Sequence, residues 1–376
     1  QSPFRRQRSH RQRGEGDKIK VGITHGDYNG IGYELILKIL DDGRLAELCT
    51  PVIYGSAKIA ANYRKQLGLQ GQQLQQVKSA DQATDNQASI INVIGEDAKV
   101  ETGNASREAG KAAFDALERA VADLREGKID VLVTAPINKA TIHSELFPFP
   151  GHTEYLETSL GEGSKALMIL FSGDLRVALV TIHVPVSKVA EQLTTEAIVE
   201  KIKQFDASLN KDFNIVKPRI AVLSLNPHSG DNGLIGNEEK EIIIPAIEEA
   251  RAQKIHAFGP YAADGFFGSG NYKKFDGVLA MYHDQGLAPF KALAGTGGVN
   301  FTAGLPIVRT SPDHGTGYDI AGQNLADPES MRQAIYAAID IHRNRRLWAE
   351  RTANPLRRQY VDKSKDNVVL DLTKDK

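Results

Sequence analysis

Three histidines follow strand-like runs of the chain, at positions suited to metal binding. His183 follows residues 176–182, His228 follows residues 219–225, and His283 follows residues 277–282. In open α/β sheets, ligands bind beyond the carboxyl ends of the strands. Three neutral imidazoles leave open positions on a divalent ion, which is typical of catalytic sites where the ion acts as a Lewis acid. Taken one at a time, each histidine is better explained by a structural hydrogen bond, and only the occurrence of three in separate loops of one region favours a metal site.

A second group of residues has the chemistry to bind an anion. Lys291 and Arg309 flank the Gly-rich residues 295–298, and Asn300 follows shortly after the glycines. Lys offers a point charge and Arg a planar fork, so both suit a phosphate or a carboxylate. Arg309 is predicted to end an apolar strand and open a polar loop, which favours a functional role. Lys291 fits a solvated helix position equally well.

The Gly-rich turn at residues 24–32 (THGDYNGIG) follows the first predicted strand and opens a helix. It does not match G-x-G-x-x-G, and a tight strand-to-helix turn explains it as well as a dinucleotide site does. The sequence contains no G-x-x-x-x-G-K-[ST] motif and no G-x-S-x-G motif. Three classes therefore fit these residues: a metal-assisted hydrolase, a metal-dependent dehydrogenase, and a binding protein for phosphorylated metabolites. A hydrolase needs no nicotinamide cofactor, and a binding protein shows affinity without turnover.

Apolar runs of strand length alternate with stretches of helical periodicity from residue 19 onward. The strand-like runs are residues 20–24, 51–54, 90–94, 129–134, 166–171, 176–182, 219–225, 277–282 and 306–309. The clearest helix is predicted over residues 105–126, which are rich in Ala. This alternation predicts an α/β fold with a largely parallel sheet.

Chain-breaking residues predict two domains, one inserted into the other. The prolines and glycine of residues 147–151 (FPFPG) cannot continue a helix or a central strand, and a second crossing is expected near residues 295–298. The first domain is then residues 19–147 plus 296–348, and the second is residues 148–295, with the three histidines. Residues 1–18, which contain five Arg, are expected to form a disordered leader, and residues 349–376 a charged tail with a short edge strand at 368–372.

The composition excludes several classes of partner. The 376 residues include 46 basic and 47 acidic ones, so no global field attracts nucleic acid or an anionic membrane. The apolar runs are far shorter than the roughly 20 residues of a membrane helix. The single Cys49 excludes an internal disulfide and a Cys-rich metal site, and it fits the reducing cytoplasm. Any metal must therefore be bound by histidine and carboxylate.

Several motifs together closely resemble the 4-hydroxythreonine-4-phosphate dehydrogenase family of vitamin B6 biosynthesis. They are GD at 26–27 with GIG at 30–32, GHTE at 151–154, NPHSG at 226–230, GP at 259–260 with Asp264, MYHDQGL at 281–287, GLP at 304–306, RTS at 309–311 and DHGT at 313–316. The motifs run in order from about residue 19 to about residue 345. The YHDQG and NPHSG segments are the most specific of them.

The resemblance implies a fold similar to that of the isocitrate and isopropylmalate dehydrogenases. That fold has two α/β/α domains with a cleft between them, and the family is a homodimer whose active site is shared between subunits. The implied reaction is NAD-dependent oxidation of the C3 hydroxyl of 4-phosphooxy-L-threonine to a β-keto acid, which decarboxylates to 3-amino-2-oxopropyl phosphate. The alternative is a relative that oxidises 4-phospho-D-threonate or 4-phospho-D-erythronate in sugar-acid catabolism.

The resemblance also carries roles onto residues of this chain. The implied metal ligands are His183, His228 and the partner subunit's His283, with zinc, magnesium or cobalt as the ion. The implied substrate-binding residues are His152, Thr153, Lys291, Asn300 and Arg309. Residues 313–322 resemble the adenosine-side loop of the isopropylmalate dehydrogenases, which assigns NAD binding to His314, Gly315, Thr316 and Asp319. The candidate proton carriers are Asp284, Asp264 and Lys139.

The sequence departs from the family pattern in the first turn. His25 and Tyr28 stand where the family usually has proline. This departure predicts a local difference in the wall of the cleft.

Overall fold

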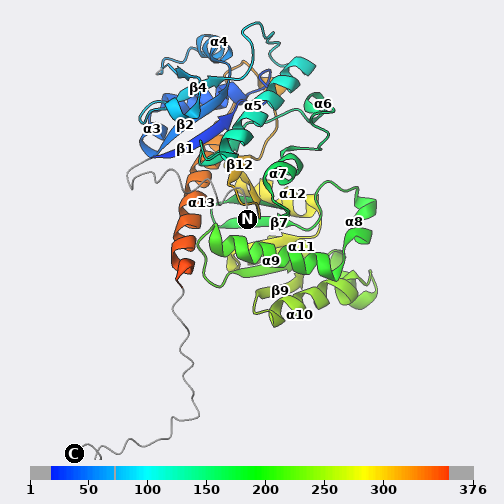
Figure 1. Ribbon diagram of the computed structural model, residues 1–376. Helices are drawn as coiled ribbons and strands as arrows, with labels where there is room; N and C mark the ends of the chain where they lie inside the picture. The colour runs from blue at the N-terminus through cyan, green and yellow to red at the C-terminus, as the bar shows by residue number, and fades with distance from the viewer. Residues whose placement is uncertain (1–17, 72, 355–376) are drawn as a thin grey trace, which may run out of the picture.

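The computed structural model describes residues 18–71 and 73–354. Its twelve strands form one mixed sheet in the order β3-β4-β2-β1-β5-β12-β11-β6-β7-β10-β8-β9 (Figure 1). The strands are β1 (Ile19–Thr24), β2 (Cys49–Gly55), β3 (Gln75–Val77), β4 (Ser89–Asn92), β5 (Val131–Thr134), β6 (Leu167–Ser172), β7 (Leu175–Leu179), β8 (Arg219–Leu223), β9 (His256–Tyr261), β10 (Gly277–Ala280), β11 (Val299–Ala303) and β12 (Arg309–Pro312). The mixed α/β class is therefore confirmed.

Helices cover both faces of this sheet. The α-helices are α2 (Gly32–Asp41), α3 (Leu45–Leu48), α4 (Ala57–Leu67), α5 (Arg107–Arg125), α6 (Lys139–Ile142), α7 (His152–Leu160), α8 (Val186–Gln192), α9 (Thr195–Lys211), α10 (Ile244–Ala252), α11 (Ala263–Gly268), α12 (His283–Ala294) and α13 (Glu329–Ala353). Short 3-10 segments are η1 (Ala80–Gln82), η2 (Pro227–Gly233), η4 (Asn271–Lys274) and η5 (Tyr318–Ile320), and η3 (Glu239–Ile243) is a π-helix. Residues 1–17 of the expected leader and the expected strand at 368–372 lie outside the described residues.

The sheet has two parallel parts joined by antiparallel strands. Strands β3, β4, β2, β1, β5 and β12 pair in parallel, and so do β7, β10, β8 and β9. Between them, β11 pairs antiparallel with β12 and β6, and β6 pairs antiparallel with β7. Because one sheet crosses both expected domain boundaries, the division at 147/148 and 295/296 stays a prediction.

Most predicted strands are present, but the prediction at residues 306–309 is wrong. The strand β12 begins at Arg309 and runs to Pro312, so Arg309 opens the strand instead of ending it. Its sequence, RTSP, is polar although it is buried between β5 and β11. An apolar-run criterion therefore misplaces it, and the same criterion passes over β3, β9 and β11. In addition, α13 continues to Ala353, past the expected boundary at 348.

The Ala-rich helix α5 is confirmed almost to the residue. It begins after Ser106, whose hydroxyl accepts a hydrogen bond from the Ala109 amide at 3.1 Å. Its Ala and Leu residues face β1, β2 and β5, and small side chains allow the helix to pack closely on these strands. The helix therefore fixes the carboxyl end of β5, from which one wall of the cleft begins.

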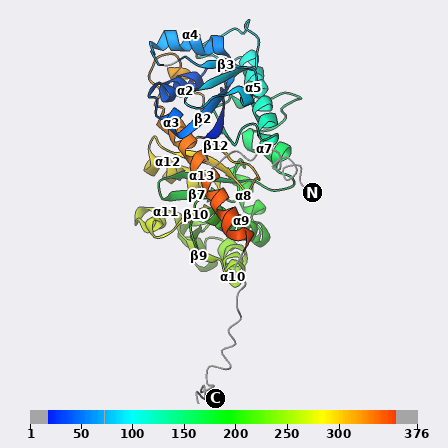
Figure 2. The ribbon, with the colours of Figure 1, turned by 60° about the vertical axis from the view of Figure 1, so that its left-hand side comes forward.

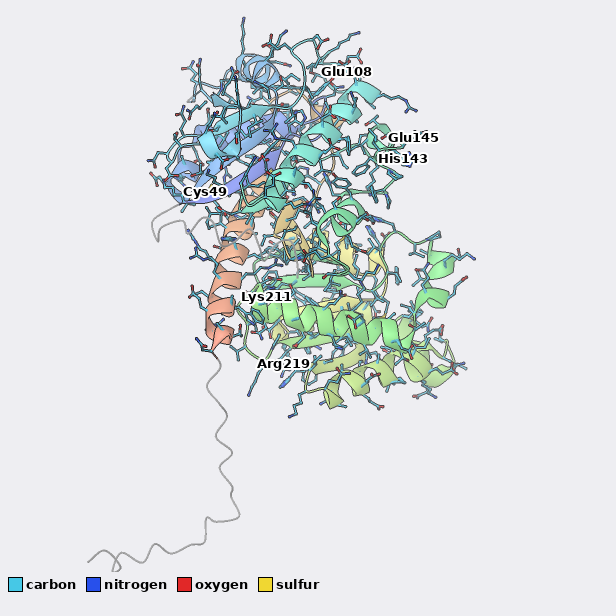
Figure 3. All side chains as sticks on the ribbon, viewed as in Figure 1. Cys49, Glu108, His143, Glu145, Lys211 and Arg219 are labelled. Atoms are coloured by element: carbon cyan, nitrogen blue, oxygen red, sulfur yellow. The ribbon has the colours of Figure 1, made fainter. Side chains whose placement is uncertain are left out.

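Helix α13 connects the two parts of the sheet. Both views show it running from the part that contains β1 to the part that contains α9 (Figures 1 and 2). At its far end, Arg345 donates to the nearly buried carboxylate of Asp212 at 2.6 Å, and Lys211 lies 5.3 Å from the centre of the Trp348 ring (Figure 3). Removing either partner of such a buried ion pair is strongly destabilising. The pair therefore helps to hold the two parts of the sheet in one orientation.

The departures from the family pattern at His25 and Tyr28 lie in the core. His25 is fully buried, its Nε2 donates to the Ala112 carbonyl at 3.0 Å, and its Nδ1 accepts from the Tyr33 hydroxyl at 2.7 Å. Tyr33 in turn accepts from the Ser56 amide. Neither His25 nor Tyr28 lines the cleft described below, so the expected change in the cleft wall is wrong. His25 and Tyr28 contribute to the stability of the fold instead, because both side chains are packed in the core.

His25 is expected to make the fold sensitive to acid. Burial lowers its pKa from 6.5 to about 4, so the folded protein resists a proton that the unfolded chain accepts. The stabilisation is complete above pH 6.5 and is lost as the pH falls toward 4, which amounts to about 2 kcal/mol of unfolding free energy by pH 5. Urea unfolding at pH 7.5 and 5.0 measures this loss. His25→Gln should show a smaller loss than the wild type, and equal losses in the two proteins would contradict the prediction.

Candidate active site

A cleft of about 260 Å³ opens over the middle of the sheet. Leu170, Asn300 and Ser311 lie opposite one another in the register of β6, β11 and β12, so they share the face that forms its floor. Its walls come from the loop after β5, the first turn of α7, the loop after β7, and α12. The complete lining is Thr134, Ala135, Pro136, Ile137, Lys139, Gly151, His152, Thr153, Glu154, Met168, Leu170, His183, His283, Leu287, Lys291, Asn300, Arg309, Ser311, Pro312, Asp313, His314 and Gly315.

Arg309 lies in this cleft as a buried guanidinium group without an acidic partner. It is 3% exposed, and its donors reach hydroxyl groups: Thr134 at 2.7 and 3.1 Å and Thr302 at 2.9 Å. In the part of the chain that the structure describes, no carboxylate forms an ion pair with it. Burial lowers the pKa of Arg309 to about 9, against an opposing effect of Glu154, so the group stays cationic at neutral pH. An unpaired buried charge is costly, so an anionic ligand would stabilise it.

Further basic side chains line the same cleft. His152 begins α7, and its pKa lies well below the ordinary value because it is buried and because Arg309 and Lys139 are nearby. Lys139 and Lys291 are exposed, and among the described residues neither forms an ion pair. The structure therefore brings together the five residues predicted for substrate binding, namely His152, Thr153, Lys291, Asn300 and Arg309.

The sequence analysis missed four polar residues of the cleft. They are Thr134, Glu154, Ser311 and Asp313. Thr134 could have been predicted from the sequence, since it ends the predicted strand at 129–134 and ligands bind at the carboxyl ends of such strands. Glu154 belongs to the GHTE motif, but nothing in the sequence indicated that it faces Arg309 and His183, whose pKa values it raises.

His183 and His283 are neighbours in the cleft. Their ring centres are 6.0 Å apart. The Nδ1 of His283 lies 2.7 Å from the Asp284 carboxylate and donates to it, so Nε2 is the ring nitrogen that remains for a metal ion. The pKa of His183 is lowered, first by burial and then by Lys139 and His283, so its imidazole is neutral. Neutral imidazoles with a free nitrogen are the form in which histidine binds metals.

His228, by contrast, lies outside the cleft. It is exposed on η2, the turn that follows β8. Within residues 18–71 and 73–354, no group of three His, Cys, Asp or Glu side chains is arranged to hold a metal ion. One chain alone therefore contributes two of the three predicted imidazoles to its cleft.

The loop predicted to bind NAD borders the cleft with His314 and Gly315, whereas Thr316 and Asp319 lie beyond its lining. The buried Asn300 Oδ1 and His314 Nε2 have no hydrogen-bond partner among the described residues. Buried polar atoms of this kind are rare in native proteins. A ligand in the cleft would satisfy them.

The Gly-rich first turn supports this loop. The Ile31 amide donates to the Thr316 carbonyl at 2.8 Å, and the Tyr318 hydroxyl donates to the Asp27 carboxylate. A Cβ atom at Gly30 would come within 2.5 Å of the Thr316 carbonyl oxygen, so the glycine is needed for close backbone approach. The packing interpretation of this turn thus describes it better than a phosphate-binding one.

The three candidate proton carriers have different positions. Lys139 lines the cleft. Asp284 is exposed beside it and is held by His283. Asp264 is exposed on α11 and does not line the cleft of its own chain.

Comparison with known proteins identifies the family. A family model described as "Pyridoxal phosphate biosynthetic protein PdxA" matches residues 47–338. The 4-hydroxythreonine-4-phosphate dehydrogenase of Bacteroides thetaiotaomicron is 59% identical over 358 residues, which cover 95% of this chain and 98% of the relative. The chain belongs to the PdxA family.

Solved structures agree with this family assignment. The crystal structure of 4-hydroxythreonine-4-phosphate dehydrogenase from Klebsiella pneumoniae is 35% identical, has a TM-score of 0.75, and matches 88% of this chain and 99% of its own. A terephthalate 1,2-cis-dihydrodiol dehydrogenase from Burkholderia xenovorans is more distant, at 26% identity and a TM-score of 0.57, with 86% of this chain and 98% of its own covered. As a PdxA family member, the chain is an oxidoreductase. Among the described residues, each helix is too short or too polar to span a lipid bilayer.

Proposed function

We propose that this PdxA family member oxidises 4-phosphooxy-L-threonine with NAD and a divalent metal ion, in pyridoxal phosphate biosynthesis. The resulting β-keto acid then loses CO2 to give 3-amino-2-oxopropyl phosphate. The observation that carries the proposal is Arg309, a buried cation that forms no ion pair with any described residue and lies in a cleft lined by further basic groups. A small substrate with a phosphate and a carboxylate carries two anionic groups that such a cleft can bind. The names of the relatives support this substrate.

The donor set of the cleft fits a divalent metal ion. Two imidazoles bound to one ion at about 2.1 Å have ring centres roughly 5 to 6 Å apart, and those of His183 and His283 are 6.0 Å apart. The hydrogen bond from His283 to Asp284 orients the ring as in known metal sites. When bound, the ion supplies a Lewis acid for the oxygen at C3. Zinc, magnesium and cobalt are the candidates.

We assign the third imidazole to a second copy of the chain. The family resemblance attributes His283 to the partner subunit, but the proximity of His183 and His283 within one chain favours His228 instead. Val186 and Leu234 lie shortly after His183 and His228, and they are 77% and 82% exposed. Large apolar side chains exposed beside both loops support contact with a second copy. The proposed enzyme is therefore a homodimer with shared active sites.

Residues 313–322 are the proposed site for NAD, which supplies the hydride acceptor. The Nε2 of His314 supports this placement, since it borders the cleft and has no hydrogen-bond partner among the described residues. Gly315 has no side chain, so the backbone beside His314 is accessible, and Thr316 and Asp319 continue the loop away from the cleft. Its attachment to the first turn holds the loop in place.

In this proposal, the side chains that line the cleft bind the anionic groups of the substrate and transfer protons to and from it. Arg309 donates to the buried anionic end, and Lys291 adds a point charge at the mouth, with Asn300 and Thr153 as neutral partners. Oxidation removes the hydroxyl proton and a hydride from C3; NAD takes the hydride, and Lys139, which must be in its neutral form for this step, is the candidate in the cleft to take the proton. After the bond to CO2 breaks, the same group can return a proton to the substrate carbon. Asp284 is the second candidate, whereas Asp264 acts only if a second copy brings it to the cleft.

A relative supports a second substrate class. A protein of Oceanobacillus iheyensis, provisionally named D-threonate 4-phosphate dehydrogenase, is 39% identical over 325 residues. Such a sugar acid has a hydroxyl where 4-phosphooxy-L-threonine has an amino group, and the same basic cleft would bind its anions. In either case we place the enzyme in the cytoplasm, where its unpaired Cys49 remains reduced.

Metal-dependent NADH formation tests the proposal. Metal-stripped and metal-restored protein should be offered 4-phosphooxy-L-threonine, 4-phospho-D-threonate and 4-phospho-D-erythronate in parallel. We expect turnover of 4-phosphooxy-L-threonine, at least tenfold faster after metal is restored. Turnover of the sugar acids alone would assign the enzyme to carbon catabolism. No NADH from any of the three would refute the proposal.

A further inference from the structure

We propose that Glu239 is the positioning residue that sets the place of His228. The inference deepens the proposed function and rests on it, because it assumes that His228 binds the metal ion in the cleft of a second copy of the chain. Glu239 lies in none of the motifs discussed above. It begins the π-helix η3, a rare conformation that is frequent at functional sites.

The turn that carries His228 has an unusual backbone. Residues 228–232 all have positive φ, with values of 45° to 54° at the four non-glycine positions and 79° at Gly230. Left-handed backbone is unfavourable for every residue other than glycine, because Cβ comes too close to the following carbonyl oxygen. Four such residues in one turn persist only if surrounding contacts determine their conformation.

Glu239 supplies contacts of this kind. Its Oε1 accepts from the backbone amides of Leu225 and Asn226 at 3.1 and 2.7 Å, and its Oε2 accepts from the Asn226 side chain at 3.0 Å. The residue is 2% exposed, so these charge-assisted bonds form away from water, where they are strong. A Cβ atom at Gly230 would come within 2.6 Å of Oε2, so the carboxylate also packs under the middle of the turn.

These contacts determine where the His228 ring lies. Asn226 is held at its backbone and at its side chain, two residues before His228, so the direction in which the chain leaves β8 is fixed. The amide of Ile235 closes the turn on the Gly230 carbonyl at 2.8 Å. Without the carboxylate, the strained residues would relax toward right-handed backbone, and the exposed imidazole would move with them. Groups that orient a metal ligand in this way typically change metal affinity by about 10- to 100-fold.

Metal affinity of the purified full-length protein tests the inference. Zn²⁺ competition with a chromophoric chelator should show about 10- to 100-fold weaker binding by Glu239→Ala. Glu239→Gln, which keeps one acceptor, should fall between it and the wild type. The matched control is Glu34→Gln, because Glu34 is equally buried and accepts from the Asn324 and Ala326 amides at 3.1 and 2.7 Å. It should lose stability but keep its metal affinity within about twofold.

Subunit mixing provides a second readout that a loss of stability would not produce. Glu239→Ala chains mixed with His183→Ala chains should regain activity at limiting metal, because one cleft of the hybrid dimer is intact. The same chains mixed with His228→Ala chains should not. If Glu239→Ala does not fold, Glu239→Gln takes its place in both mixtures.

The outcomes separate the inference from the proposed function. Wild-type Zn²⁺ affinity in both Glu239 variants, with weakened affinity in His228→Ala, overturns the role of Glu239 alone. Wild-type affinity in His228→Ala overturns both the three-imidazole site and this inference. Restored activity in the mixture with His228→Ala also overturns the role of Glu239.

Discussion

Replacing Arg309 by Met is expected to lower kcat/KM for the phosphorylated substrate by about a thousandfold or more. The side chain is buried, its charge has no acidic partner among the described residues, and an anion is the ligand that would satisfy it. Two hydrogen bonds from a charged donor contribute about 4 kcal/mol together, which corresponds to a factor of about a thousand. The free energy of unfolding without ligand should stay the same or rise, because the variant no longer buries an unpaired charge.

The matched control is Arg345→Met. Arg345 is also largely buried, but its charge is paired with Asp212 and its Nη1 donates to two carbonyl groups. Its removal should cost about 3–5 kcal/mol of stability and leave kcat/KM within a few-fold. Steady-state kinetics and urea unfolding of both variants give the comparison. An Arg309→Met enzyme within tenfold of the wild type would contradict an anion-binding role.

Each of His183→Ala, His228→Ala and His283→Ala is expected to lose nearly all metal-dependent activity alone, and particular pairs should regain it when mixed. If His228 serves the cleft of the other subunit, His228→Ala chains complement both other variants. In an equal mixture, half of the dimers are hybrids and each hybrid has one intact site, so about a quarter of the wild-type activity returns. The mixture of His183→Ala with His283→Ala should stay inactive.

The same three mixtures distinguish the alternatives. If His283 is the residue from the partner, its variant complements both others, and the mixture of His183→Ala with His228→Ala stays inactive. If all three imidazoles serve one chain's own cleft, no mixture regains activity. Subunit exchange should be verified with differently tagged chains, so that a lack of complementation contradicts a shared site.

The fold class, most of the strands and the family could be predicted from local patterns in the sequence. These features depend on local chemistry: apolar runs of strand length, a strong helical period in α5, and ordered motifs such as YHDQG and NPHSG. The motifs also pointed to the residues that line the cleft, because a motif records residue type at a fixed position. Local patterns failed at β12, where a polar segment is buried in the middle of the sheet and its apolar neighbours are not part of the strand.

The surroundings of each of these residues, by contrast, could not be predicted, because they depend on how distant parts of the chain pack together. Arg309 depends on Thr134, far earlier in the chain, and on the lack of an ion-pair partner among the described residues, neither of which a sequence pattern expresses. His183 and His283 come together because β7 and β10 are neighbours in the sheet. His228 is exposed on η2, after β8, and does not line the cleft. Burial, pairing and proximity are properties of the packed chain, so they become visible only once the sheet order is known.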